Sequence, residues 1–226
     1  MIKPGMILVV ALAEAVCLGG SARPSCADGF TAMPVTIETR SDFASITITN
    51  PGDHKMYLEN AVYEWTADSL GHEKLAESET AIASPPAMWV QPRATYNLRI
   101  HLPPATDNEL AFRVVIQQVP DRSEIQAGRI VFALTQRLPA FSEPAEAPAP
   151  PALSARIVDP QHLLITNEGG RRARLADITV DGRVVAAGLV GYALAHSSLA
   201  IALKSPISPG KIGVETDLGH RDVDLR

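Results

Sequence analysis

Apolar and polar residues alternate along most of this chain, and the longest regular case is the segment 128–144, GRIVFALTQRLPAFSEP. Successive side chains of a β-strand point to opposite faces, so this segment predicts one strand over 128–141 that runs into a proline-rich hinge. The two faces would carry Ile130, Phe132 and Leu134 on one side and Val131, Ala133 and Thr135 on the other. Both rows are largely apolar, which is typical of a central strand buried on both sides. It is equally typical of an edge strand whose outer row binds another protein.

The segments before this strand show the same two-residue alternation. Turn residues at Asn50-Pro51-Gly52 and three prolines within 81–100 separate them. The expected strands lie around Val35 and Ile37, around Ile46 and Ile48, over 56–65, within 81–100 and over 110–119. Short strands separated by turns, without a helical period, predict a β-sandwich for residues 28–143.

A proline-rich stretch, 144–152, follows this domain and predicts an extended, semi-rigid linker. Beyond it, residues 153–226 again carry short alternating runs. Asp181-Gly182 lies between two of these runs and is a strong hairpin signal, because both residues tolerate positive φ. The expected strands are 162–167, 172–180, 183–189 and 198–203. The sequence therefore predicts an all-β chain in which two sandwich domains are joined by a proline-rich hinge.

The first 27 residues have the layout of a secretory signal peptide. Lys3 precedes an apolar segment that is short for a membrane span. The small residues Ser25-Cys26-Ala27 then form the expected cleavage site. Glu14 interrupts the apolar segment, so a non-cleaved anchor is the alternative. Cleavage after Ala27 would remove both cysteines, lower Lys+Arg from 20 to 18 and lower Asp+Glu from 25 to 24, for a net charge of −6. We therefore expect a mildly acidic mature chain without a disulfide or a membrane span.

Composition and residue spacing argue against several functions. A chain with 46% hydrophobic and 20% charged residues can bury ordinary cores, and its acidic balance does not suit nucleic acid. The six histidines lie beside turns without metal-ligand spacing. His196-Ser197-Ser198 lacks the glycines of a nucleophile elbow. We therefore expect no enzymatic activity, no cofactor and no metal site.

A series of short motifs follows the expected strands. In the first domain they are TITNPG at 47–52, Trp65, Ser84-Pro85-Pro86, AFRVVIQQVP at 111–120 and the alternating last strand. In the second domain they are NEGGRRARLADI at 167–178 and GLVGYAL at 188–194. Each motif is weak alone, but their order and spacing resemble the PapD-like periplasmic chaperones of the chaperone-usher pilus pathway. The motifs of the second domain resemble the branch of that family often called archaic.

The resemblance implies two immunoglobulin-like domains, a periplasmic location, and two kinds of partner: pilin or fimbrial subunits and an outer-membrane usher. Such subunits lack the last strand of their own sandwich, and the chaperone would lend a strand to fill the groove, which is a form of β-strand addition. The side chains expected to enter the groove are Ile130, Phe132, Leu134 and Leu138. Val131 and Ala133 would then face the chaperone's own core.

The resemblance also implies a basic anchor for the subunit's terminal carboxylate. The better-known branch uses an arginine on the first strand and a lysine on the last, where this chain has Pro34 and Pro139. Arg113 and Arg137 are the candidates here, because an arginine fork binds a carboxylate through two parallel hydrogen bonds. The alternative for each is a surface arginine without a special partner. The alternative for the chain is an exported immunoglobulin-like binding or structural protein, and self-association could cap the apolar edge of the free protein.

Overall fold

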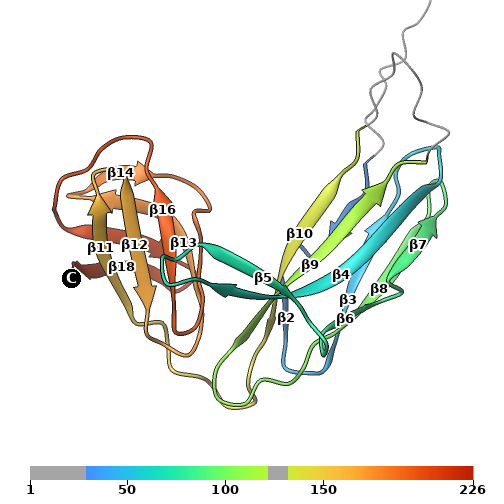
Figure 1. The fold of residues 1–226 in the computed structure, drawn as a ribbon, viewed down its shortest axis with the longest axis horizontal. Coiled ribbons are helices and arrows are strands. Elements are labelled where there is room, and N and C mark those ends of the chain that lie inside the picture. Colours follow the sequence, from blue (N-terminus) through green and yellow to red (C-terminus); the bar gives the residue numbers. More distant parts are fainter. Residues whose placement is uncertain (1–28, 122–131, 226) are drawn as a thin grey trace, which may run out of the picture.

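The computed structural model of the chain describes residues 29–121 and 132–225, and its regular elements there are all β-strands (Figure 1). They form two domains set at an angle to each other. In this part of the chain, no helix has the length and apolar character needed to cross a bilayer. The strands are β1 (Thr31–Met33), β2 (Ile37–Thr39), β3 (Phe43–Thr49), β4 (Met56–Ala67), β5 (Glu73–Glu77), β6 (Ile82–Ser84), β7 (Ala87–Val90), β8 (Thr95–His101), β9 (Leu110–Val119), β10 (Thr135–Ser142), β11 (Leu153–Asp159), β12 (His162–Asn167), β13 (Ala173–Val180), β14 (Arg183–Ala186), β15 (Gly191–Ala193), β16 (Ser197–Ala202), β17 (Ile212–Thr216) and β18 (Gly219–Leu225).

The first domain packs two sheets against each other. One sheet has the order β1-β3-β8-β6, and the other has the order β2-β10-β9-β4-β5, with β7 also paired to β4. The chain passes from one sheet to the other between Met33 and Ile37. Fully buried side chains from both sheets, among them Ile46, Leu98 and Ile116, form one hydrophobic core. The predicted sandwich is therefore confirmed for this domain.

Alternation and turn chemistry account for much of this domain. β3 buries Ile46 and Ile48 completely, and β9 covers the predicted segment 110–119. After β3, the fully buried side chain of Asn50 donates to three backbone carbonyls and accepts one backbone amide. It thereby satisfies polar backbone groups that would otherwise be buried without partners, and this fixes the predicted turn.

The last strand of the first domain differs from its prediction in extent. Part of the predicted strand lies in 122–131, outside the described residues, and β10 begins only at Thr135. β10 pairs with β9 in antiparallel fashion along its whole length. On its other side it pairs with β2 only over the last three residues, Ala140 to Ser142. Among the described residues, no strand pairs with that side of β10 over 135–139.

The second domain contains β11 to β18 in one continuous sheet, with the order β14-β13-β17-β18-β11-β12-β16 and β15 also paired to β13. The sheet folds over on itself, so that Leu163 of β12 and Leu175 of β13 pack in the same core. At the predicted hairpin, Asp181 and Gly182 have φ angles of 48° and 76°, and β13 pairs with β14 across the turn. The hairpin prediction is confirmed.

Candidate functional site

An apolar row on the last strand of the first domain extends beyond the core of that domain. Leu138 and Ala140 of β10 are paired with buried residues of β9 and belong to the core. Gln136 is next in this alternate row, and its side-chain amide donates to the carbonyl of Phe30. Leu134 and Phe132 lie just before β10, and the carbonyl of Leu134 accepts from the amide of Gln118 on β9. Leu134 is 38% exposed and Phe132 is 73% exposed. The segment that leads into β10 therefore carries two large apolar side chains that the domain leaves exposed.

This register corrects two of our sequence expectations. Leu138 was expected to bind a partner, but it is only 7% exposed and packs in the core of its own domain. Ala133 was expected to face that core, but it is exposed. The reason is the pairing of β10 with β9, which turns the row of Leu138 and Ala140 inward and the row of Thr135 and Arg137 outward. Ile130 and Val131 lie outside the described residues.

The candidate anchor Arg113 lies on the outward face of β9. Its Nε donates to Oε1 of Glu73 at 2.7 Å, and its guanidinium carbon lies 3.5 Å from the centre of the Trp65 ring. Its side chain is 17% exposed, so it is partly desolvated between these two partners. Arg113 is therefore a fixed basic group and not a solvated surface arginine.

The second candidate, Arg137, lies on the same outward face of the neighbouring strand β10. It is paired with Val115, while Arg113 is paired with Pro139, so the two arginines are diagonal neighbours. Arg137 is exposed. The structure thus brings both candidate arginines to one face of two adjacent strands, and β10, which carries Arg137, has no partner strand over 135–139 among the described residues.

An aromatic cluster joins the two domains next to this patch. Trp65 and Phe141 come from the first domain and Tyr192 from the second, and their ring centres lie 5.5 to 5.9 Å apart in all three pairs. Leu194 completes the buried cluster. Aromatic pairs at such distances contribute about 0.5–1.5 kcal/mol each beyond the area they bury. The cluster therefore helps to hold the domains in this arrangement.

A charged cluster that the sequence analysis did not predict crosses the same junction. The side chain of Arg172, in the second domain, is 2% exposed and forms ion pairs with Glu38 and Glu109 of the first domain. Its guanidinium also lies 3.8 Å from the centre of the Phe141 ring. Burial raises the pKa of the Glu109 carboxyl, although Arg172 acts in the opposite direction. The only local signal was a run of arginines in NEGGRRARL, which does not say which of them is buried.

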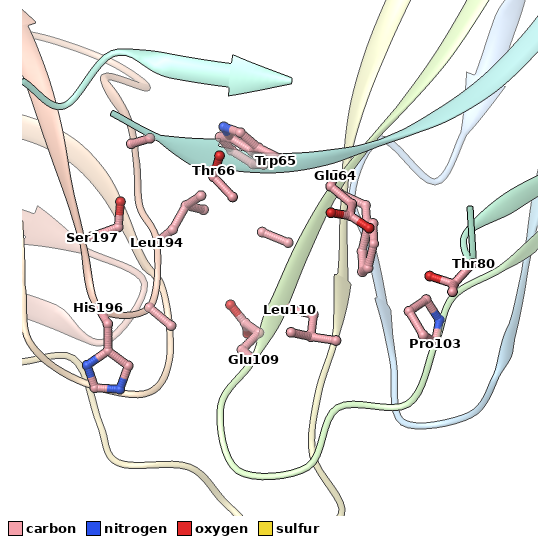
Figure 2. Close-up of a pocket in the computed structure, with 14 residues that line it drawn as sticks. Glu64, Trp65, Thr66, Thr80, Pro103, Glu109, Leu110, Leu194, His196 and Ser197 are labelled. Atoms are coloured by element: carbon pink, nitrogen blue, oxygen red, sulfur yellow. The ribbon is translucent and has the colours of Figure 1, made fainter. Parts of the chain in front are cut away.

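A cavity of about 460 Å³ lies between the domains beside this cluster. Figure 2 shows Leu194, His196 and Ser197 of the second domain on one side and Leu110, Thr80 and Pro103 of the first on the other. Trp65 and Glu109 also line it. In the described part of the chain, no three His, Cys, Asp or Glu side chains gather as metal ligands. The cavity thus combines apolar walls with several polar side chains, among them the Glu109 carboxyl group that pairs with Arg172.

The hairpin of β4 and β5 reaches from the first domain to the second (Figure 1). At its tip, the carbonyl of Gly71 accepts a hydrogen bond of 2.9 Å from the amide of Ala200 on β16. Gly71 has a φ of 82°, and a Cβ at this position would lie 2.6 Å from that amide nitrogen. Only glycine fits both the backbone conformation and the close approach. The hairpin that carries Trp65 and Glu73 is therefore fixed at both ends.

Solved structures with a similar fold include several chaperones. The chaperone-tip adhesion subunit complex CsuC-CsuE, from the archaic chaperone-usher Csu pili of Acinetobacter baumannii, aligns with a TM-score of 0.72 at 20% identity. That alignment covers 88% of this chain and 99% of the other. The Salmonella enterica SafA pilin in complex with the SafB chaperone aligns with a TM-score of 0.62 at 19% identity, over 87% of this chain and 97% of the other. The Escherichia coli chaperone DraB aligns with a TM-score of 0.59 at 17% identity, over 88% and 97%.

Sequence comparison gives the family directly. No curated protein matches the chain by sequence. The family described as "Pili and flagellar-assembly chaperone, PapD N-terminal domain" matches residues 30–148, which is more than half of the chain. The resemblance noted in the short motifs is therefore confirmed, and the chain belongs to the PapD-like family of pilus assembly chaperones.

Proposed function

We propose that this protein is a periplasmic chaperone that holds a pilin or fimbrial subunit by lending it the strand around Phe132 and Leu134. It would then deliver the subunit to an outer-membrane usher. Two of the similar structures are complexes of a chaperone with a tip adhesion subunit or a pilin. Export would depend on the signal peptide expected in residues 1–27, which lie outside the described residues.

The observation that carries this proposal is the pair of exposed apolar side chains in the segment that leads into β10. A subunit that lacks its last strand could pair with the free edge of β10 over 135–139 and cover Leu134 and Phe132 with its own core. Full burial would contribute up to about 1.5–3 kcal/mol for Phe132 and less for Leu134, which is only 38% exposed before binding. If the alternation of the sequence continues, Ile130 would be the next apolar side chain to enter the subunit. Leu138 packs in the chaperone's own core.

Arg113 would bind the subunit's terminal carboxylate, with Arg137 as its neighbour. Both lie on the outward face, Arg137 on β10 and Arg113 on the adjacent strand β9, and Arg113 is partly buried. A charge-assisted hydrogen bond in such a partly desolvated place is stronger than one in water. The anchor would fix the register of the subunit strand along β10, so that Phe132 and Leu134 enter the pockets of the subunit's groove.

The experiment is co-expression of the mature chain with its pilin subunit, followed by purification through a tag on the chaperone. Phe132→Glu and Leu134→Glu should lose the subunit, because each places an unpaired charge in an apolar groove. Thr135→Glu is the matched control: it adds the same charge to the exposed outward face and should retain the subunit. All three should keep the thermal midpoint of the unmodified chaperone. Equal subunit recovery by Phe132→Glu and Thr135→Glu would contradict the proposal.

A further inference from the structure

The side chain of Arg113 extends across β4 toward β5. In the sheet, Arg113 lies opposite Tyr63 of β4. Its guanidinium instead stacks on Trp65, two residues further along β4, and its Nε binds Glu73 on β5. The side chain therefore leans along the sheet toward the tip of the β4–β5 hairpin.

Glu73 occupies only one side of the guanidinium. It accepts from Nε, and among the described residues neither Nη1 nor Nη2 of Arg113 donates a hydrogen bond. A guanidinium has five donors in a rigid plane, so the two terminal nitrogens can still bind a second carboxylate through parallel hydrogen bonds. The stack on Trp65 fixes the plane of the guanidinium group, and the hydrogen bond to Glu73 fixes the rotation of the group within that plane.

We infer that Glu73 is a positioning residue that, with Trp65, holds Arg113 ready with its terminal nitrogens free for the carboxylate of the bound subunit. This inference rests on the proposed role of Arg113 as the carboxylate anchor. An arginine that is already ordered loses less conformational freedom when it binds, which strengthens binding. A free side chain would have to be ordered at the moment of capture.

The hairpin makes this arrangement depend on the second domain. Trp65 packs against Tyr192, and the hairpin tip accepts a hydrogen bond from Ala200. Glu73 begins β5, two residues after Gly71 at that tip. The position of Glu73, and through it the orientation of Arg113, is therefore fixed by contacts with both domains.

The test uses the purified mature chain and two versions of one probe, the C-terminal twelve or so residues of the co-purifying subunit, made with a free carboxylate and with an amide. The unmodified chaperone should bind the carboxylate form more tightly, and Arg113→Ala should remove that preference. Glu73→Ala should weaken binding of the carboxylate form by about 2- to 10-fold, the factor expected when one side chain is no longer ordered beforehand. Binding of the amide form should stay unchanged. Glu73→Gln should restore most of the preference, because its amide oxygen can still accept from Nε.

Glu77→Ala is the control, because Glu77 is an exposed glutamate at the other end of β5 and should leave both affinities unchanged. NMR relaxation of the Arg113 Nε–H group, measured without any probe, should show an ordered group in the unmodified chain and a mobile one in Glu73→Ala. An unchanged carboxylate preference in Glu73→Ala, or an equally ordered Nε–H group, would overturn the inference while the proposed function stands. If the unmodified chaperone binds neither the subunit nor the probe, the proposed function itself fails.

Discussion

Removal of Arg172 should separate the two domains without unfolding either of them. The Arg172 side chain is 2% exposed and that of its partner Glu109 is 1% exposed, and the two lie in different domains. Loss of one member of a buried pair leaves the other charge uncompensated and typically costs about 3–5 kcal/mol. Because burial already raises the pKa of Glu109, this carboxyl can take up a proton instead of staying charged, which limits the cost. We therefore expect Arg172→Ala to weaken domain docking by about 3 kcal/mol, which is roughly a 100-fold change in the docking equilibrium.

Small-angle X-ray scattering should show a larger radius of gyration for Arg172→Ala, while urea unfolding of the separate domains should change little. Arg171→Ala is the matched control, since Arg171 is 32% exposed and its pair with Glu143 is longer, at 3.7 Å. Such a pair contributes about 0–1 kcal/mol. Adding Glu109→Gln to Arg172→Ala should recover part of the docking, because no buried charge is then left unpaired. A radius of gyration for Arg172→Ala equal to that of Arg171→Ala would refute this account of the junction.

Three further results are expected. In urea unfolding, Leu138→Ala should lower the free energy of unfolding of the first domain by about 2–5 kcal/mol. Phe132→Ala should change it by less than about 0.5 kcal/mol. Equal effects of the two substitutions would show that the register of β10 is wrong. Gly71→Val should release the hairpin tip and increase hydrogen exchange of the Ala200 amide without lowering the urea midpoint of the first domain, because its Cβ would meet backbone atoms of β16. The raised pKa of Glu109 implies a contribution to the free energy of unfolding that is fully present below its unfolded value of 4.5 and is lost as the pH rises through the raised folded value. In urea titrations, the free energy of unfolding of the unmodified chain, relative to that of Glu109→Gln, should therefore fall as the pH rises above 4.5. An increase with pH would contradict the raised pKa of Glu109.

Local signals in the sequence predicted most of the strands but not which face of the last one is buried. Asp181-Gly182 marked its hairpin because its two positive φ angles suit few other residues. The alternation along 128–141 identified a strand, yet both of its rows are apolar, so alternation alone could not choose the core face. That choice is made by the pairing of β10 with β9, a contact between segments that local patterns do not describe. The same pairing removed Leu138 from the expected binding residues.

The junction between the domains could not be predicted for a related reason. Arg172 meets Glu109 and Glu38 across 63 and 134 positions of sequence, and nothing in the neighbourhood of any of the three indicates the others. Four strands of the second domain were also missed, namely β11, β15, β17 and β18. β15 has three residues, and β18 carries a single buried side chain, Val223, so neither shows a clear apolar period. The alternating runs and turn residues of the other strands still predicted a sandwich for this domain, because they are enough to indicate its class without every strand.

The central claim is that the row of Phe132 and Leu134 enters the subunit, and site-specific photo-crosslinking tests it most directly. A photoreactive phenylalanine analogue would replace Phe132, Leu134 or, on the outward face, Thr135 in the mature chain co-expressed with its subunit. The account predicts efficient crosslinks to the subunit's core residues from positions 132 and 134. It predicts none to these core residues from position 135. Crosslinks to the subunit core from position 135, with none from positions 132 and 134, would contradict the claim.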